Sequence, residues 1–422
     1  MRVAICTDHD VEKTNGVTTT LKAWVAHADG ETHLRVFAAA DAAERVEHLR
    51  AIASWGAPLP WYRETRLCVP PVRALTRAIR EYGADVIHIT TPGPVGVAAR
   101  RAARVLGLPL VGSIHTDFAE QAFRATGQRR LADAVRRYVR WVYDACDVVL
   151  APSETSRARL IDERYDQRRV GLWSAGVDAS RFSPARRVHA LRDRWHVSDR
   201  RLAIFYAGRL AHEKGLDLIE PLHRWLLRRG IAHRFIFAGE GPAKPRIAEG
   251  CPDALFLGVR PHAEIGVAMA SADAFLFPSA TDESGVAVLE AQASGLPVIV
   301  SDRGASAESM LAGRTGFVCA DGNVEQFGAA IVELARRPAV RQAMSSAARD
   351  YALGRSWPQS LVRLRATWRA AVDRTAAPAY LGARGNLSGL SVNSASTPRS
   401  NRKWRISAST VENAPGAAAR NV

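Results

Sequence analysis

Two basic residues stand close together after an apolar run near the middle of this 422-residue chain. The run Leu202 to Tyr206 reads as a strand; Gly208-Arg209 follows it, and Lys214 comes five residues later. We expect a helix to begin beside Lys214, so that two cations and the positive end of a helix converge. Such a site suits a leaving diphosphate, on which negative charge grows as its bond breaks.

Acidic residues follow a second apolar run. The run Ala274 to Phe277 leads into Asp282 and Glu283, and the segment after Gly285 reads as a helix that contains Glu290. A strand, a tight turn and a helix N-terminus leave amide N–H groups unpaired, and these can bind a phosphate. A carboxylate beside them can accept hydrogen bonds from the hydroxyl groups of a sugar.

The spacing of these acids leaves their roles open. Asp282 and Glu290 are eight residues apart, whereas Glu283 and Glu290 are seven apart and would share a helix face. Either Asp282 or Glu283 could instead serve only to stabilise the helix N-terminus. Glu290 is harder to explain in that way, because it lies among apolar residues, where an unpaired charge is costly.

Two weaker signals lie in the first half of the chain. His115 follows the apolar run Leu110 to Ile114, at what would be the carboxyl end of a strand. A single histidine there is more often structural than functional. The pair Asn15-Gly16 is a turn signal after the first strand, and as a turn it needs no further function.

The acidic segment and the Gly-Arg-x4-Lys motif resemble the signature of retaining glycosyltransferases of the GT-B fold, specifically the large bacterial group called family 4. The family register places Asp282, not Glu283, at the first acidic position. An Asp there departs from the usual Glu and resembles a lipid-directed, mannosyl-type branch. Ser284 stands where the family usually has an aromatic residue, and Asn15 replaces its first glycine.

The resemblance implies roles for particular residues. The diphosphate would be held by Arg209, Lys214 and the amides of Gly16 and Gly285. Glu290 would bind the ribose hydroxyls, Asp282 the sugar, and His115 would lie near the sugar and the acceptor. The loops at Glu240 and Val259 would lie near the nucleoside, and Val286 would complete the donor site. We expect His115, Asp282, Arg209 and Lys214 to be the catalytic residues.

Composition is that of an ordinary globular protein, with 47% hydrophobic and 24% charged residues. The five cysteines have no CxxC spacing, which argues against a zinc site or a disulfide framework and favours a reducing cytoplasm. Asp8 and Asp10 interrupt the apolar N-terminus, so we expect a strand there and no signal peptide. No run approaches the roughly 18 uncharged residues of a membrane helix.

The net charge of +16 calls for an explanation. From Tyr380 onwards the chain holds six basic residues against one acidic residue in a stretch of low periodicity, so we expect a disordered basic tail over 380–422. A basic surface attracts nucleic acid, anionic lipid and phosphorylated ligands alike. The arginine-rich segment Arg124 to Asp144 is either a solvent-exposed helix face or a helix that binds anionic lipid at the inner face of the membrane.

Apolar runs and helical segments alternate along both halves of the chain, which predicts an α/β protein. Strands are expected in both halves at residues 3–6, 34–37, 86–89, 110–114, 148–150, 202–206, 234–237, 255–257, 274–277 and 298–300. We predict two Rossmann-like, doubly wound domains facing a central cleft, as in the GT-B fold: an acceptor domain over 1–175 and a donor domain over 176–355. An amphipathic helix over 356–375 would cap the first domain, as the resemblance implies.

The hypothesis is therefore transfer of a hexose, with retention, from a nucleotide diphosphate sugar to a lipid or glycan acceptor. GDP-mannose is the favoured donor, and no metal or other cofactor is expected. A UDP-sugar-dependent enzyme of the same fold and a GT-B-fold epimerase or phosphorylase are the alternatives. A nucleic-acid-binding protein is a distant alternative, because that function does not explain an acidic residue, Glu290, within an apolar segment. We therefore expect no nucleic acid partner.

Overall fold

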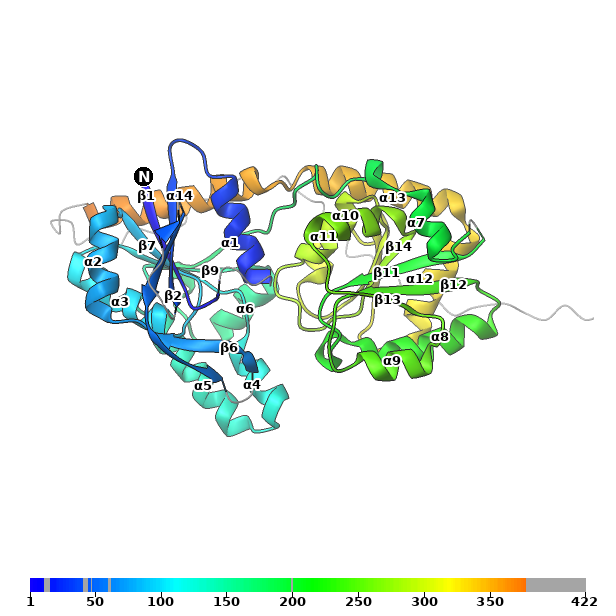
Figure 1. The fold of residues 1–422 in the computed structure, drawn as a ribbon, viewed down its shortest axis with the longest axis horizontal. Coiled ribbons are helices and arrows are strands. Elements are labelled where there is room, and N and C mark those ends of the chain that lie inside the picture. The colour runs from blue at the N-terminus through cyan, green and yellow to red at the C-terminus, as the bar shows by residue number, and fades with distance from the viewer. Residues whose placement is uncertain (11–15, 41–44, 47, 60–61, 199, 377–422) are drawn as a thin grey trace, which may run out of the picture. The chain divides into compact units, whose positions relative to one another are not determined.

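The computed structural model describes residues 1–10, 16–40, 45–46, 48–59, 62–198 and 200–376 (Figure 1). The expected Asn15 turn position and the expected basic tail over 380–422 lie outside these residues. The chain from Met1 to Pro378 forms one compact unit, which contains all the elements named below.

The first half of this unit is built on a mainly parallel sheet in the order β10-β9-β8-β7-β1-β2-β4-β3, with β3 antiparallel to β4. Its strands are β1 Arg2–Thr7, β2 His33–Ala40, β3 Arg45–Val46, β4 Leu49–Ala53, β7 Val86–Ile89, β8 Leu110–Ser113, β9 Val148–Ala151 and β10 Val170–Leu172. A separate antiparallel hairpin joins β5 (Trp55–Leu59) and β6 (Tyr62–Val69). The sheet is flanked by the helices α1 Gly16–Ala26, α2 Val72–Tyr82, α3 Pro94–Leu106, α4 Phe118–Thr126, α5 Arg129–Tyr143 and α6 Glu154–Asp162.

The second half carries a parallel sheet in the order β13-β12-β11-β14-β15-β16. Its strands are β11 Leu202–Ala207, β12 His233–Ala238, β13 Leu255–Gly258, β14 Ala274–Phe277, β15 Val298–Ser301 and β16 Gly316–Cys319. Its helices are α7 His189–Arg194, α8 Ile219–Arg228, α9 Lys244–Gly250, α10 His262–Ser271, α11 Val286–Ala293, α12 Val324–Arg336 and α13 Pro338–Leu353 (Figure 1).

These two sheets confirm the predicted α/β fold with two doubly wound, Rossmann-like halves. Every expected apolar run lies on a strand or directly overlaps one. The central strands are buried on both faces, because helices cover both sides of a parallel sheet. Their aromatic rings, among them Phe205, Phe237 and Phe275, are fully buried and form the core of the second half.

The last described helix, α14 (Trp357–Ala376), returns to the first half of the chain (Figure 1). It contacts α1, β7 and β8. The Trp368 indole N–H donates to His88 of β7 at 3.0 Å, and the Ser360 hydroxyl donates to the carbonyl of Ser174. Its apolar face, which includes Leu361 and Leu364, is buried. The amphipathic pattern therefore packs this helix against the first sheet.

Among the described helices, none combines the length and apolar character that crossing a membrane requires. Four cysteines, Cys6, Cys146, Cys251 and Cys319, are buried as free thiols. Burial raises the pKa of Cys251 to about 12, with Asp253 adding to the shift. These thiols behave as small apolar core residues.

A first prediction concerns the junction of α14 with the segment between the two sheets. A Cβ atom on Gly176 would lie 2.6 Å from the backbone N and Cα of Trp357, so Gly176→Ala must push the start of α14 away. We expect a loss of about 1–3 kcal/mol in the free energy of unfolding, measured by chemical denaturation. Gly354→Ala is the matched control, because its Cβ would meet only Tyr351 O at an ordinary 3.6 Å. Equal stability of the two variants would contradict the close approach.

Candidate active site

The loop after β11 carries the two expected cations. The Tyr206 hydroxyl donates to the carbonyl of Arg209 at 2.9 Å, and the Arg209 guanidinium lies 3.4 Å from the carboxylate of Glu213. Lys214 ends a short 3-10 turn, His212–Lys214. Gly215 then turns the chain with a φ of +70°, and a second 3-10 turn, Leu216–Leu218, leads directly into the helix α8 at Ile219.

The loop after β14 packs directly onto this loop. The Thr281 hydroxyl donates to the carbonyl of Glu213 at 3.0 Å. A Cβ on Gly215 would lie 2.2 Å from Pro278 O, so only glycine allows this approach. Since β11 and β14 are neighbouring parallel strands, their carboxyl ends bring Lys214 and Asp282 to one edge of the sheet.

Asp282 holds the turn that leads into the helix α11. Its Oδ2 accepts from the amide of Gly285 at 2.6 Å and from the Ser306 hydroxyl at 3.3 Å. Burial raises the pKa of Asp282, while the nearby Lys214 and these two hydrogen bonds oppose the shift. The Gly285 amide that we expected to hold a phosphate therefore already has an acceptor, in the turn just before α11.

Glu283 has a different set of partners. Both of its oxygens bind the guanidinium of Arg159, at 2.8 and 3.1 Å, and the Ser156 hydroxyl donates to it at 2.5 Å. Arg159 also pairs with Asp117 at 2.8 Å. Both partners of Glu283 belong to the first half of the chain, and so does Asp117. Glu283 thus links the two halves, which the sequence pattern did not reveal.

A second carboxylate makes the same kind of link. The oxygens of Glu308 accept from the backbone amides of Glu154 and Thr155, at 2.7 and 2.8 Å, and from the Thr155 hydroxyl. These amides belong to the first turn of α6, where N–H groups have no partner within the helix. Two acids of the second half therefore hold the N-terminal part of α6.

Glu290 lies on α11 and is 9% exposed. Burial raises its pKa to about 8, with Arg181 opposing the shift. Its Oε1 lies 3.7 Å from Nε2 of His262, whose pKa burial lowers, so the contact joins two groups that are both neutral near pH 7. A neutral, buried carboxyl group can both donate and accept hydrogen bonds.

The other expected donor-site residues lie at helix or strand ends. Gly16 is the first residue of α1, and a Cβ there would meet open space. Val286 begins α11. Glu240 follows β12 and accepts from Lys244 at 2.9 Å, and Val259 follows β13 with 74% of its surface exposed.

His115 lies just beyond β8, with Ile114 between them. Its Nε2 lies 2.8 Å from the Ser113 hydroxyl, and its ring packs on Trp173 at 4.8 Å. Burial, together with the neighbouring His88 and His9, lowers its pKa to about 3. His9, at the end of β1, was not singled out from the sequence. Its Nε2 is buried without a partner in the described part of the chain.

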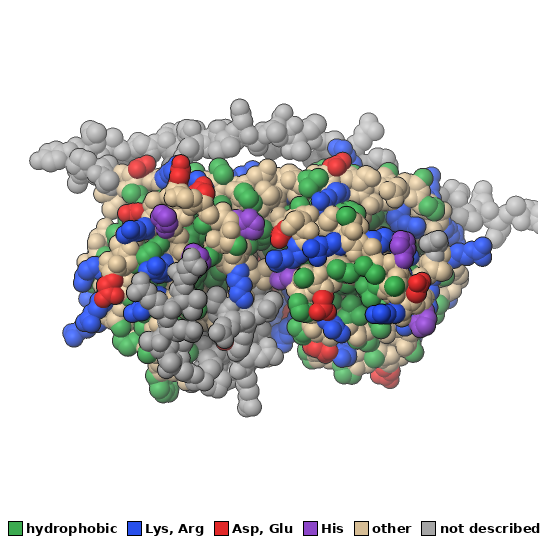
Figure 2. Space-filling model, turned by 45° about the horizontal axis from the view of Figure 1, so that its top comes forward, with side chains coloured by type: hydrophobic (Ala, Val, Ile, Leu, Met, Phe, Trp, Pro, Cys, Tyr) green, Lys and Arg blue, Asp and Glu red, His purple; other side chains and the backbone are tan. Residues whose placement is uncertain are grey.

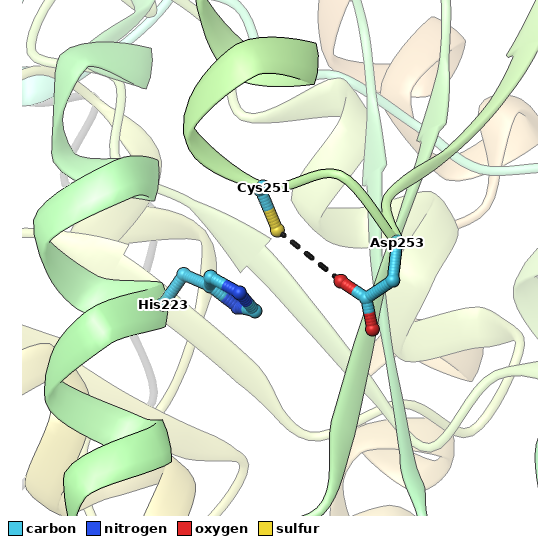
Figure 3. Close-up of side chains that lie close together, drawn as sticks. All are labelled: His223, Cys251 and Asp253. Atoms are coloured by element: carbon cyan, nitrogen blue, oxygen red, sulfur yellow. Dashed lines mark hydrogen bonds between the residues drawn. The ribbon is translucent and has the colours of Figure 1, made fainter.

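One group among the described residues has the composition of a metal site: His223, Cys251 and Asp253, whose potential ligand atoms lie within 4.8 Å of one another (Figure 3). The Cys251 thiol points at Asp253, 3.7 Å from its Oδ1, and Arg201 pairs with Oδ2 of the same carboxylate. The cluster lies at the amino ends of β12 and β13, away from the loops described above. With the thiol protonated and the carboxylate neutralised by Arg201, its chemistry fits a packed polar cluster better than a cation site.

The burial of Glu290 predicts a pH dependence of stability. Because the pKa of Glu290 rises from 4.5 to about 8 on folding, the folded protein holds a proton that the unfolded chain releases. This contribution is present below pH 4.5 and is lost as the pH rises towards 8, by at most about 1.4 kcal/mol per pH unit. Relative to Glu290→Gln, the unmodified protein should lose stability between pH 5 and 8 in denaturation experiments. Glu264→Gln, at an exposed carboxylate, should show no such difference.

The Glu283 link predicts unequal effects of two arginine substitutions on the same helix. Arg159→Ala leaves Glu283 and Asp117 without their cation and should cost about 1–3 kcal/mol of unfolding free energy. Arg157→Ala removes a pair with the exposed Glu154 and a long, 3.4 Å hydrogen bond to the carbonyl of Val170, and should cost about 0–1 kcal/mol. Chemical denaturation at pH 7 measures both. If Arg157→Ala proves as costly as Arg159→Ala, the link contributes nothing specific.

Comparison with known proteins agrees with this geometry. Residues 14–181 match the model of Glycosyltransferase Family 4, and residues 201–337 match that of Glycosyl transferases group 1. A GDP-mannose-dependent alpha-mannosyltransferase of Mycobacterium tuberculosis is 32% identical over 85% of this chain and 93% of its own length. One of Corynebacterium glutamicum is 33% identical over 71% of this chain and 72% of its own.

Solved structures show the same fold. Anabaena HepE in complex with UDP superposes with a TM-score of 0.71 at 18% identity, over 88% of this chain and all of that one. Sucrose-phosphate synthase of Thermosynechococcus elongatus gives a TM-score of 0.70 at 17% identity, over 88% of this chain and 99% of its own. The chain belongs to glycosyltransferase family 4 and is a glycosyltransferase with the GT-B fold.

Proposed function

We propose that this glycosyltransferase transfers mannose, with retention of configuration, from GDP-mannose to a lipid or glycan acceptor. The observation that carries the proposal is the packing of the Arg209–Lys214 loop against the Asp282 loop at the carboxyl edge of the second sheet. The names of the relatives with 30–33% identity favour the donor, since they are GDP-mannose-dependent mannosyltransferases.

In this proposal Arg209, Lys214 and the amide of Gly16 bind the diphosphate, and the charge that grows on it lowers the barrier to bond cleavage. These groups replace the charge neutralisation that a divalent metal supplies elsewhere, so the proposal contains no metal. Glu240 and Val259 lie beside the nucleoside, and Glu290 binds the ribose hydroxyls. Because the buried carboxyl group of Glu290 is neutral, a hydroxyl group is a better partner for it than a cation.

Asp282 changes partners when the donor binds. A phosphate oxygen takes its place as acceptor of the Gly285 N–H, beside the first turn of α11 at Val286. The released carboxylate then accepts a hydrogen bond from a hydroxyl of the sugar. The exchange keeps the Gly285 amide paired in both arrangements, so little hydrogen bonding is lost.

Retention follows if attack occurs on the face from which the diphosphate leaves. The bond between the anomeric carbon and the phosphate oxygen breaks, and the bond to the acceptor oxygen forms on the same side. The proton of the acceptor hydroxyl passes to the leaving phosphate oxygen. His115 lies close to this centre as a neutral group, because its pKa is about 3.

If the acceptor is a lipid, the protein acts in the cytoplasm, at the inner face of the membrane. The α5 helix exposes Tyr138 and Trp141, at 43% and 49%, beside basic residues. Two of its arginines are engaged locally, Arg136 with Glu163 and Arg140 with Asp144. Lys and Arg side chains lie scattered over the face shown in Figure 2, among acidic and uncharged ones, which favours weak attraction to a lipid surface over binding along a nucleic acid.

The donor base is tested by thermal denaturation with GDP, UDP or ADP at equal concentrations. GDP should raise the melting temperature most; at 100 times its Kd the stabilisation amounts to about 2.7 kcal/mol. A larger shift with UDP would assign a UDP-sugar instead. NMR of the mannosylated product should show the α configuration of the donor, and a β product would exclude retention.

The diphosphate site is tested by the double substitution Arg209→Ala/Lys214→Ala. Transfer from GDP-mannose should fall by about 100-fold or more, with the melting temperature unchanged, because the growing charge loses both cations. Arg246→Ala is the matched control: this arginine pairs with Asp217 on the same half of the chain but has no part in the proposed site. Full activity of the double variant would refute the assignment.

A further inference from the structure

A buried chain of hydrogen bonds leads from α14 to His115. The Trp368 indole nitrogen lies 3.0 Å from Nδ1 of His88. Nε2 of His88 lies 2.8 Å from the Ser113 hydroxyl, which lies 2.8 Å from Nε2 of His115. Trp368, His88 and Ser113 are each 0% exposed. The chain therefore joins the last described helix to the strands β7 and β8 out of contact with water.

The direction of this chain follows from its first member. An indole nitrogen can only donate, so Nδ1 of His88 must accept. A neutral His88 then carries its proton on Nε2 and donates it to the oxygen of Ser113. The single hydroxyl proton of Ser113 is left for Nε2 of His115, which accepts it. A neutral His115 therefore carries its own proton on Nδ1.

The opposite direction is excluded by the same geometry. It would put a proton on Nδ1 of His88 and bring two N–H donors within 3.0 Å of each other in a buried place. A buried donor without an acceptor costs about 1–3 kcal/mol. Trp368 thus selects one of the two possible arrangements, although three hydrogen bonds separate it from His115.

Both histidines are neutral over the physiological pH range. Burial lowers the pKa of His88 and of His115 to about 3. The groups that act on His115 are His88 and His9, which both lower its pKa, and no carboxylate of the described residues raises it. The assignment of one proton to each ring therefore holds.

The Nδ1 edge of His115 remains available. His115 is only half-buried, and its ring is held between Trp173 at 4.8 Å and Trp24 at 5.9 Å. No described residue accepts from Nδ1, and this atom is not one of the fully buried polar atoms that lack a partner. A ligand oxygen can therefore reach the N–H group.

We propose that Trp368, His88 and Ser113 are positioning residues that fix His115 as a hydrogen-bond donor through Nδ1–H. His115 would then bind an oxygen of the donor sugar or its diphosphate and would not act as a general base. The identity of that oxygen rests on the proposed function; the tautomer does not. The proposal also gives α14 a role in the site, because its docking against β7 sets the hydrogen bonding of His115.

The tautomer is measured by proton–nitrogen NMR correlation of the full-length protein labelled with 15N-histidine, without nucleotide. The spectrum of His115→Gln identifies the His115 signals. We expect Nδ1 protonated and Nε2 unprotonated at pH 7. A proton on Nε2, or a doubly protonated ring, would overturn the proposal regardless of which donor the enzyme uses.

The role of Trp368 is tested by Trp368→Phe, which keeps an aromatic ring but removes the N–H. His88 can then reverse, and His115 should shift wholly or partly to the Nε2–H tautomer. Trp24→Phe is the matched control: Trp24 packs on His88 at 5.5 Å, but its indole N–H has no acceptor in the described part of the chain. If the two variants change the His115 signals equally, the effect is one of packing and the proposal fails.

The consequence for turnover is tested with Ser113→Ala and Ser113→Thr. Ser113→Ala removes the hydroxyl that orients His115 and should lower kcat about tenfold or more with a smaller change in the KM for the donor. Ser113→Thr retains the hydroxyl and should restore most of the loss. The pH profile of kcat/KM should contain no ionisation that His115→Gln removes; such an ionisation would make His115 a base and overturn the proposal. If the enzyme shows no GDP-mannose activity, the proposed function fails, while the NMR result still decides the tautomer.

Discussion

The close packing of two loops at the carboxyl edge of the second sheet is the constraint on which the site depends. β11 and β14 are adjacent and parallel, so the chain leaves both strands at the same edge. The hydrogen bond from Thr281 to Glu213 and the contact of Gly215 with Pro278 then bring Lys214 close enough to Asp282 to act on its pKa. Without this parallel pairing, Lys214 and Asp282, which are more than 60 positions apart, would not lie close enough to influence each other electrostatically.

Four acids divide the tasks of this region between them. Asp282 holds the turn before α11, Glu283 and the exposed Glu308 hold α6 in the first half of the chain, and Glu290 lies neutral inside α11. The difference arises from the burial and the partner of each. Amides and a guanidinium pair with the first three, whereas the buried Glu290 lies against a neutral histidine and retains its proton. A carboxylate that links the two halves also makes their arrangement sensitive to charge.

The first half contributes aromatic and histidine side chains where the second contributes charges. Trp24, Trp173 and Trp368 pack around the histidine pair His88 and His115, and His88 lies among them out of contact with water. Desolvation keeps these imidazoles neutral, so their hydrogen bonds have a definite direction. α14 supplies one of these rings from the far end of the chain, which ties the last described helix to the site of the first sheet.

Local pattern determined the elements of this protein. Apolar runs of three to five residues, separated by helical segments, are enough to predict parallel strands, and the turn residues around Gly285 and Gly295 mark the ends of α11. The motif spacing also pointed to Lys214 and Asp282, whose loops pack together, whereas Glu290 lies farther along α11 beside His262. Tertiary structure alone decided what each side chain bonds to. Glu283 finds Arg159 across 124 positions and Trp368 finds His88 across 280, and no local periodicity encodes such partners. Which carboxylate is used up in an ion pair, and which nitrogen of His115 carries the proton, follow from those distant contacts, because hydrogen-bond direction and desolvation depend on neighbours in space.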